Sequence, residues 1–504
     1  MKLVTPKMIP EIDRFAIEEL GISEIELMRR SAEAVKKAIK NEFPDKKKVL
    51  ILAGKGNNGG DGYALSALMN SEYDISVYDL FSSGQRSSSG KFYLNEYIRL
   101  GGRVNTGFPC KEALDNTDVV VDAIFGTGFC GELSEELISF SNMLSESNTP
   151  VVAIDVPLGV DAEFGRVLEG ALKADLTVEL SYMKVGLLSY PARQYLGKIY
   201  YSDLDLPGEK LEKSFTLENY LVDKSEAKIL LPKRRADSNK GSFGKALLIT
   251  GSSKYEGAGR LSLEAALRGG AGITTFISTV SLRDRFIPDF PEAIYEPLLD
   301  YTKESTEKIL AATKKHNAIL IGSGSGVSEK LYNLIREIIN TEGAPVVLDA
   351  DALNSIALYG ADVLKKSKRK LVLTPHPMEF SRLTGISVEE INSNRLQVAK
   401  AFCEENNCIL LLKGAATVIT DGKTVYINST GSSALAKGGS GDALAGLLVS
   451  LIAFSSDPLK ATALSAYIHG EAGDRLSSIY SDFGVTPKDL PKEMAKVIRD
   501  LEIG

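Results

Sequence analysis

The sequence predicts an α/β protein with two domains, each built on a parallel sheet covered by helices. Its 504 residues allow two large domains, or three of roughly 150 residues. Short runs rich in Val, Ile and Leu recur between longer helix-like segments, which is typical of buried parallel strands joined by helices. This pattern starts afresh in the second half of the chain, so we expect two separate sheets.

The predicted strands can be placed individually. In the first half they lie at 49–53, 75–80, 119–125 and 151–155. In the second half they lie at 246–250, 273–278, 318–322 and 346–350, near Leu371, and at 409–413. Between the halves, 206–223 carries turn and charge signals without a strong period. We place the boundary near Lys213, which gives domains 1–212 and 213–504.

Composition narrows the class of protein. Hydrophobic residues make up 44% and charged residues 25%, as in ordinary globular chains. The net charge is −7, so the chain lacks the global basic field that non-specific nucleic-acid binding uses. The basic clusters at 46–48, 233–235 and 365–370 contain no interleaved aromatics, and we interpret them as solvated surface. We therefore expect no nucleic-acid partner.

Cysteine usage and hydropathy predict a cytoplasmic protein without a membrane partner. The cysteines Cys110, Cys130, Cys403 and Cys408 include no CxxC pair, and with three histidines there is no zinc-ligand spacing. We expect them to be small, reduced core residues. The N-terminus has charges and prolines where a signal peptide is apolar, and the longest nearly apolar run, 443–454, is shorter than the roughly 20 residues that span a bilayer.

The first glycine-rich loop follows the strand at 49–53. Gly54, Gly56 and Gly59 satisfy GxGxxG between a strand and a helix, where backbone amides can approach a pyrophosphate. On this pattern alone the loop indicates a Rossmann-like dinucleotide site, with Asp79 at the end of the next strand as a candidate ribose partner.

The polar residues of this loop indicate a more particular ligand. Asn57, Asn58 and Asp61 would repel a bare pyrophosphate but suit a hydrated sugar, an amide or a hard cation. Asp122 and Asp155 each end a predicted strand beside a glycine turn, where an open α/β sheet gathers its ligands. We expect these groups to share one site.

A second glycine-rich loop, 438–441, precedes Asp442 and an apolar helix. Its amides and the helix N-terminus form an anion site, where Asp442 can take a proton from a hydroxyl that attacks a nucleotide's terminal phosphoryl group. The segments 322–326, 374–380 and 413–417 also follow strands and can converge there. His376, between two prolines, is a candidate ligand; His316 and His469 are interpreted as structural.

The first half resembles the NAD(P)H-hydrate epimerase domain over roughly 1–207. The resemblance lies in LMRRSAEAV, GKGNNGGDGY, DAIFGTG, AIDVPLGVD and KVGLLSYPA. It implies that Asn58 and Asp122 hold potassium, although Leu158 stands where the family has Ser. It also implies that the hydrated nicotinamide dinucleotide is bound by Asn57, Asn58, Gly59, Gly60, Asp61, Gly126, Thr127, Gly128, Phe129, Cys130, Gly131, Glu132 and Asp155.

The second half resembles the ribokinase-like superfamily through GGSGD. With LDADALN, TPHPMEF and KGAAT the resemblance narrows to its ADP/ATP-dependent NAD(P)H-hydrate dehydratase branch, over about 214–504. This implies that Gly326, His376 and Asp442 bind the hydrate. It implies that the nucleotide is bound by Lys413, Gly414, Ala415, Ala416, Thr417, Ser433, Ala434, Leu435, Ala436, Lys437, Gly438, Gly439, Ser440 and Gly441. Asn239, Met378 and Ser323 depart from the family pattern, which commonly has His, Gly and Pro at these positions.

Together the two resemblances imply a bifunctional enzyme that repairs NADH and NADPH hydrates, with ADP or ATP, Mg²⁺ and K⁺ as cofactors, and we expect a homo-oligomer. Asp442 would be the base for dehydration, and Asp122 or Asp155 the proton carrier for epimerisation. Two alternatives stay open: a vitamin-precursor kinase fused to a dinucleotide sensor, and a non-catalytic nucleotide-binding protein.

Overall fold

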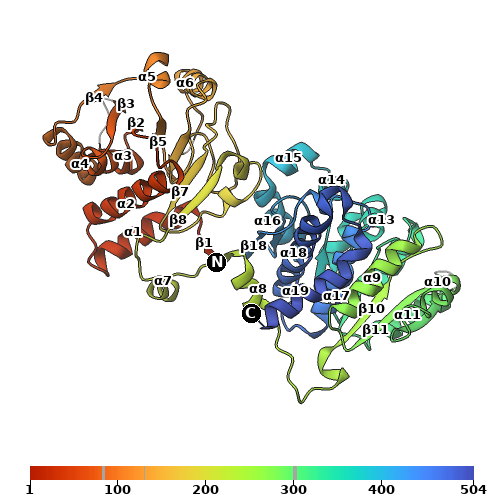
Figure 1. Ribbon diagram of the computed structural model, residues 1–504. Coiled ribbons are helices and arrows are strands. Elements are labelled where there is room, and N and C mark those ends of the chain that lie inside the picture. The colour runs from red at the N-terminus through yellow and green to blue at the C-terminus, as the bar shows by residue number, and fades with distance from the viewer. Residues whose placement is uncertain (82–85, 130, 299–302, 504) are drawn as a thin grey trace. The chain divides into compact units, whose positions relative to one another are not determined.

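The computed structural model describes residues 1–81, 86–129, 131–298 and 303–503 (Figure 1). The chain divides into two compact units, Lys2–Asn219 and Tyr220–Gly504, and Met1 groups with the second. The boundary predicted near Lys213 falls inside α7 (Gly208–Ser214) of the first unit, because Leu211 of this helix is buried in that unit's core. Both units are α/β, as predicted.

The N-terminal unit is built on a parallel sheet in the order β4-β3-β2-β5-β6-β7-β8. The strands are β2 (Lys48–Ala53), β3 (Asp74–Asp79), β4 (Val104–Thr106), β5 (Val119–Ala123), β6 (Val151–Ile154), β7 (Leu176–Leu180) and β8 (Lys198–Ser202). The other helices are α1 (Ile9–Glu18), α2 (Glu24–Glu42), α3 (Asn57–Met69), α4 (Ser88–Arg99), α5 (Lys111–Asp115) and α6 (Glu135–Glu146). All four strands predicted in this half are confirmed, and β4, β7 and β8 are additions.

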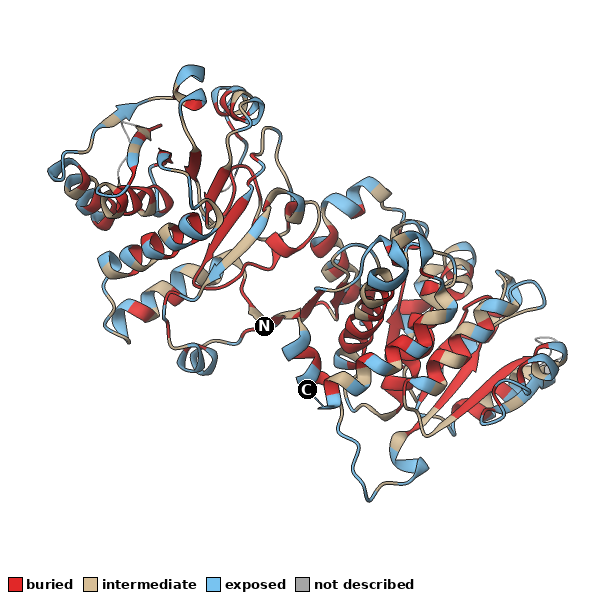
Figure 2. Ribbon diagram, viewed as in Figure 1, coloured by how far each residue is buried: buried red, intermediate tan, exposed pale blue. Residues whose placement is uncertain are grey.

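Helices cover both faces of this sheet. Along β2, Val49 and Ile51 point into a core shared with α1, α2 and α3, whereas Leu50 and Leu52 point into a second core with α5 and α6. Successive side chains of a strand face opposite sides, so a strand buried on both sides reads as a continuous apolar run. Figure 2 shows the inner strands of the sheet buried.

The C-terminal unit contains a larger sheet, in the order β9-β18-β17-β16-β15-β14-β13-β10-β11-β12. Its strands are β9 (Asn219–Val222), β10 (Lys245–Ile249), β11 (Ile273–Thr279), β12 (Ile294–Leu298), β13 (Ala318–Ile321), β14 (Val346–Leu348), β15 (Leu371–Leu373), β16 (Ile409–Leu412), β17 (Val418–Thr420) and β18 (Val425–Asn428). The strands from β10 to β16 pair in parallel, and β16, β17 and β18 pair antiparallel. The six strands predicted in this half correspond to β10, β11, β13, β14, β15 and β16.

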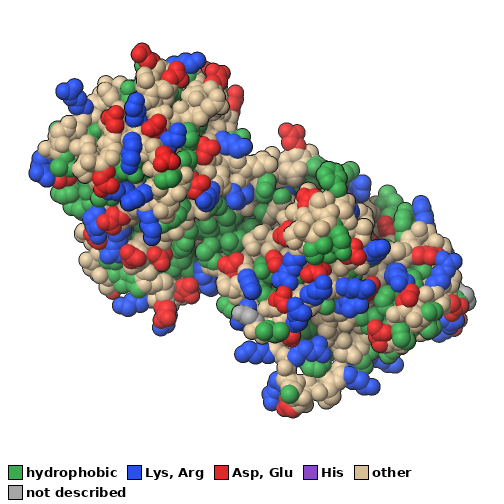
Figure 3. Space-filling model, viewed as in Figure 1, with side chains coloured by type: hydrophobic (Ala, Val, Ile, Leu, Met, Phe, Trp, Pro, Cys, Tyr) green, Lys and Arg blue, Asp and Glu red, His purple; other side chains and the backbone are tan. Residues whose placement is uncertain are grey.

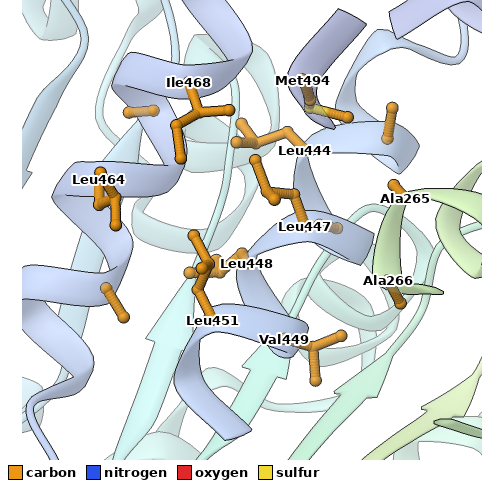
Figure 4. Packing of buried hydrophobic residues seen from close by; sticks show 14 of the residues in the cluster. Ala265, Ala266, Leu444, Leu447, Leu448, Val449, Leu451, Leu464, Ile468 and Met494 are labelled. Atoms are coloured by element: carbon orange, nitrogen blue, oxygen red, sulfur yellow. The ribbon is translucent and has the colours of Figure 1, made fainter. Parts of the chain in front are cut away.

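Helices also cover this second sheet. They are α8 (Lys224–Leu230), α9 (Glu256–Arg268), α10 (Val280–Phe286), α11 (Lys303–Thr313), α12 (Glu329–Ile339), α13 (Asp351–Tyr359), α14 (Pro377–Thr384), α15 (Val388–Ser393), α16 (Arg395–Asn406), α17 (Ser440–Phe454), α18 (Pro458–Gly484) and α19 (Leu490–Ile503). The apolar run at 443–454 is α17, which packs against α9 and α18 through Leu444, Leu447 and Leu448 (Figure 4). Among the described helices, none combines the length and apolarity needed to cross a bilayer.

The surface charges are mixed, and two of the described cysteines are buried. Acidic and basic side chains are interspersed on the face of the molecule shown in Figure 3. Cys403 and Cys408 are buried free thiols, as predicted. Cys110 is exposed, so its prediction as a core residue is wrong, and Cys130 lies outside the described residues.

Candidate active sites

The first candidate site lies where the strand order of the N-terminal sheet reverses. β2 is flanked by β3 on one side and β5 on the other, so the connections leave in opposite directions at its carboxyl end, the usual position of a ligand crevice. Gly54 follows β2 here, and a Cβ on it would come within 1.8 Å of the Ile124 carbonyl oxygen. Only glycine permits this close approach, next to a cavity of about 930 Å³.

The cavity is lined by most of the predicted residues, though not by all. Those that line it are Asn57, Asn58, Asp61, Gly126, Thr127, Gly128, Phe129 and Asp155. Those that do not are Gly59, Gly60, Asp122, Gly131 and Glu132. Cys130 lies outside the described residues.

Gly59 and Gly60 have a packing role in the first turn of α3. A Cβ on Gly59 would lie 1.9 Å from the Gly54 carbonyl oxygen, and a Cβ on Gly60 would lie 2.5 Å from the Met28 side chain. These glycines let the helix pack closely against its neighbours, and their predicted contact with substrate stays a prediction.

Asn58 and Asp122 supply oxygen atoms beside this cavity. Asn58 donates its Nδ2 hydrogen to the Phe125 carbonyl (2.8 Å), and its buried Oδ1 accepts no hydrogen bond from the described residues. Asp122 is fully buried and accepts hydrogen bonds from the amides of Ile124 (3.1 Å) and Leu158 (2.7 Å). Burial raises the pKa of Asp122 to about 6. An unpartnered amide oxygen and a buried carboxylate fit a hard cation.

The departure at Leu158 has a structural explanation. Its amide donates to Asp122, but its side chain is buried in the same apolar cluster as Ile124, Leu133 and Leu172. The isobutyl group is therefore a core group, and position 158 contributes its backbone to the site.

We expect Leu158→Ala to lower the free energy of unfolding of the N-terminal unit by about 3 kcal/mol, because it leaves a cavity in that cluster. Urea denaturation of the full chain, followed by circular dichroism, measures this change. Ile98→Ala, at a half-exposed position of α4, is the control and should change stability little. An unchanged unfolding midpoint for Leu158→Ala would show that the cluster does not depend on this side chain.

Lys184 also lines the cavity, although the sequence interpretation assigned it no role. Its side chain is 1% exposed, and its Nζ donates to Asp155 Oδ1 and to the Leu180 carbonyl (2.9 Å). Burial opposes the charge, but the carboxylates of Asp155 and Glu179 outweigh it and raise the pKa of Lys184. Asp155 has a left-handed backbone, with φ of 66°, a strained conformation typical of functional positions.

Two more carboxyl groups line the same cavity. Burial and the charge of Asp155 raise the pKa of Asp13, on α1, to about 6. Burial, followed by the charges of Asp155 and Asp13, raises the pKa of Asp61 well above its usual value. Carboxyl groups that hold protons near neutral pH suit acid–base chemistry.

An aromatic wall completes the cavity. The rings of Phe125 and Phe129 stack with centroids 4.2 Å apart, and Phe81 lies 5.8 Å from Phe125. Asp79 does not line the cavity: its carboxylate binds Arg86 and accepts a hydrogen bond from the Phe81 amide (3.2 Å). The predicted role of Asp79 as a ribose partner stays a prediction, and in this structure its carboxylate is paired with Arg86.

The second candidate site occupies the corresponding place in the C-terminal sheet. β10 is flanked by β11 and β13, and the loops after β13, β14, β15 and β16 all leave from the same edge. Asp349, after β14, is buried and accepts hydrogen bonds from Thr374 Oγ1 (2.7 Å) and Ser323 Oγ (2.8 Å). The serine that departs from the family pattern thus holds Asp349 in place.

Asp442 lies among charged neighbours at this edge. Lys413 Nζ is 3.2 Å from Asp349 Oδ1 and 3.9 Å from Glu379 Oε2, and a Cβ on Gly441 would lie 3.3 Å from it. Burial, and next the charge of Asp349, raise the pKa of Asp442 to about 7, against the opposing effect of Lys413. A carboxyl group with this pKa can act as a base near neutral pH.

Two buried side chains support the loops: His469, which the sequence interpretation treats as structural, and Arg395, to which it assigned no role. His469 Nε2 is 3.0 Å from the Ser440 carbonyl oxygen, and burial lowers its pKa to about 4, so the neutral ring donates to this carbonyl. Arg395 donates to the carbonyl of Lys413 and is buried. The glycine loop itself begins α17 after Gly439, whose φ of 103° favours glycine.

His376, which is predicted to bind the hydrate, also caps a helix. Its Nδ1 accepts hydrogen bonds from the amides of Met378 (3.2 Å) and Glu379 (3.4 Å), so the ring caps α14. Met378 contributes its amide there, and its side chain is exposed. Gly326 donates its amide to Asp351 (2.8 Å). Asn239 caps a short turn of helix through the Gly241 amide (2.8 Å).

The predicted nucleotide segment 433–441 is tied to the end of α18. Lys437 Nζ donates to the Phe483 carbonyl (2.6 Å), and Ser433 Oγ bonds to Asp482. His316 bonds to Ala312 and Thr275 within the fold, in keeping with its structural interpretation.

Known proteins resemble both units. Residues 24–186 match the family model described as YjeF-related protein N-terminus, and residues 246–496 match the model for NAD(P)H-hydrate dehydratase. A bifunctional NAD(P)H-hydrate repair enzyme of Moorella thermoacetica is 32% identical over all of this chain and 97% of its own length. The chain belongs to this family. Another repair enzyme, from Escherichia coli, is 29% identical over 96% of this chain and 92% of its own length.

Two solved structures resemble the C-terminal unit of this member of the NAD(P)H-hydrate repair enzyme family. The ADP/ATP-dependent NAD(P)H-hydrate dehydratase of Bacillus subtilis, co-crystallised with ATP/Mg²⁺, is 30% identical with a TM-score of 0.50, covering 55% of this chain and 97% of that one. A ribokinase-like superfamily protein of Enterococcus faecalis is 24% identical with a TM-score of 0.51, covering 57% of this chain and 98% of that one. The ribokinase-like fold of the C-terminal unit is thus confirmed.

Proposed function

We propose that this chain repairs NADH and NADPH hydrates: its N-terminal unit interconverts the two epimers at carbon 6 of the nicotinamide ring, and its C-terminal unit dehydrates the S epimer with ADP or ATP. Asp442 carries the proposal, because a half-buried carboxyl group with a pKa of about 7 follows a glycine loop at a helix N-terminus beside Lys413. The membership of the family supports it.

In dehydration, Asp442 accepts the proton of the hydrate's hydroxyl as its oxygen attacks the terminal phosphoryl group. The ring nitrogen lone pair then expels phosphate, and loss of a proton from carbon 5 restores the reduced nicotinamide. Lys413 and the amides of 438–441 stabilise the phosphoryl charge, and His376 and Gly326 hold the hydrate. Mg²⁺ bound with the nucleotide would neutralise the phosphates.

In epimerisation, the ring nitrogen expels the hydroxyl as water, and water adds again on the other face. Asp155 gives the departing hydroxyl a proton and recovers one later, while Lys184 holds its carboxyl group in place. Phe125 and Phe129 provide a flat apolar wall for the ring. Potassium held by Asn58 Oδ1 and Asp122 would add positive charge beside the cavity.

Product analysis tests the proposal. A mixture of hydrate epimers with ADP or ATP and Mg²⁺ should give full recovery of the near-ultraviolet absorbance of reduced nicotinamide, with release of phosphate. A vitamin-precursor kinase would leave a stable phosphate ester, and a binding protein would turn over nothing. Either of these results would refute the proposed function.

A further inference from the structure

Glu179 is a buried carboxyl group directly behind the N-terminal site. It lies on β7, has no exposed surface and does not line the cavity. Among the described residues, neither carboxyl oxygen has a hydrogen-bond partner of good geometry, and the Oε2 atom forms an ion pair with Lys184 Nζ (3.3 Å). Burying a carboxylate with so little compensation is costly, so the group needs either this cation or a proton.

Lys184 connects Glu179 to the cavity. An ammonium group has three N–H donors, and Lys184 has three acceptors around it: Asp155 Oδ1, the Leu180 carbonyl and Glu179 Oε2. Asp155 faces the cavity and Glu179 lies behind it, so the lysine bridges an outer and an inner carboxyl group.

The charges of this bridge do not balance unless one carboxyl group is protonated. One ammonium faces two carboxylates where little water reaches, and burial raises the pKa of Glu179 to about 8, so the extra proton belongs on Glu179 at neutral pH. The other titratable groups around the bridge are Asp13 and Asp61, which face Asp155 and Lys184, and Tyr201 on β8, whose pKa is raised partly by Glu179.

We propose that Glu179 is a positioning residue of the epimerase site, which passes a proton to Asp155 through Lys184 and later takes it back. In the forward step Lys184 gives a proton to Asp155 while it takes one from Glu179. The lysine keeps its charge, Glu179 becomes a carboxylate, and Asp155 becomes the acid that protonates the departing hydroxyl. When water adds to the other ring face, the proton returns by the reverse path. This inference rests on the proposed epimerase function.

The test is the pH dependence of epimerisation in the full chain, with purified epimers and detection by chromatography. For the wild type we expect the epimerase kcat to fall above about pH 8, because Glu179 then lacks the proton it supplies. Glu179→Gln should lower kcat about 100-fold at neutral pH, remove this fall and leave KM unchanged, because the amide cannot relay a proton and does not touch substrate. Glu179→Asp should restore part of kcat.

Control variants distinguish failure of the proton relay from misfolding and from failure of the proposed epimerase function. Glu112→Gln, at an exposed position of α5, should behave as the wild type, and urea denaturation followed by circular dichroism shows whether the N-terminal unit of each variant is folded. A Glu179→Gln enzyme with the wild-type kcat and pH profile would overturn the inference and leave the epimerase function standing. If Glu179→Gln does not fold, a wild-type kcat that does not fall above pH 8 overturns the inference. A wild type that does not epimerise at all refutes the proposed function instead.

Discussion

Asp442→Asn is expected to abolish dehydration while nucleotide binding remains. The amide keeps the shape of the side chain at the start of α17 but cannot accept the hydroxyl proton, so a loss of roughly 100-fold or more is expected. The surrounding loop is held by the hydrogen bonds of His469 to the Ser440 carbonyl and of Lys437 to the Phe483 carbonyl, which the change does not touch. Phosphate release and nicotinamide absorbance measure the reaction, and calorimetric titration with ADP measures binding.

The pH dependence of wild-type dehydration gives a second test of Asp442 as the base. Burial and Asp349 raise the pKa of Asp442 to about 7, so its basic form increases as pH rises through 7 and wild-type dehydration should increase with it. Asp362→Asn, at an exposed position of the same unit, should keep this profile. Near-normal dehydration by Asp442→Asn would assign the base to another group.

Asp155→Asn is expected to stop epimerisation and leave dehydration intact. The substitution removes the carboxyl group that Lys184 holds at the cavity, and a loss of about 100-fold or more is expected for an acid–base group. With a mixture of epimers, the variant should consume the S epimer, and the R epimer should remain and be lost only at the spontaneous rate.

Chromatography of the remaining hydrate against time measures this result. Asp45→Asn, at an exposed position before β2, is the matched control and should consume both epimers. Complete and rapid consumption of both epimers by Asp155→Asn would show that another group, such as Asp61 or Asp13, carries the proton. Loss of dehydration as well would indicate that the change unfolds more than its own site.

Local patterns sufficed for the main elements of the fold. The strands that the sequence predicts are confirmed because parallel strands buried on both faces need continuous apolar runs. Edge strands lack this pattern: β8 (Lys198–Ser202) is partly exposed and was missed, and so was β4 with its Asn and Thr residues. The boundary predicted near Lys213 lies within α7, a short and polar helix that buries little besides Leu211 and so leaves a weak signal in the sequence.

By itself, the sequence determined the two glycine loops, the strand ends that carry Asp122, Asp155 and Lys413, and the position of Asp442 at a helix start. These features depend on residues that are close along the chain. Only the tertiary structure decided that Lys184 forms ion pairs with both Asp155 and Glu179. It also decided that the Leu158 side chain packs in the core and that Asp79 forms an ion pair with Arg86. Such contacts join separate strands and loops, and burial sets their charges, so no local spacing can reveal them.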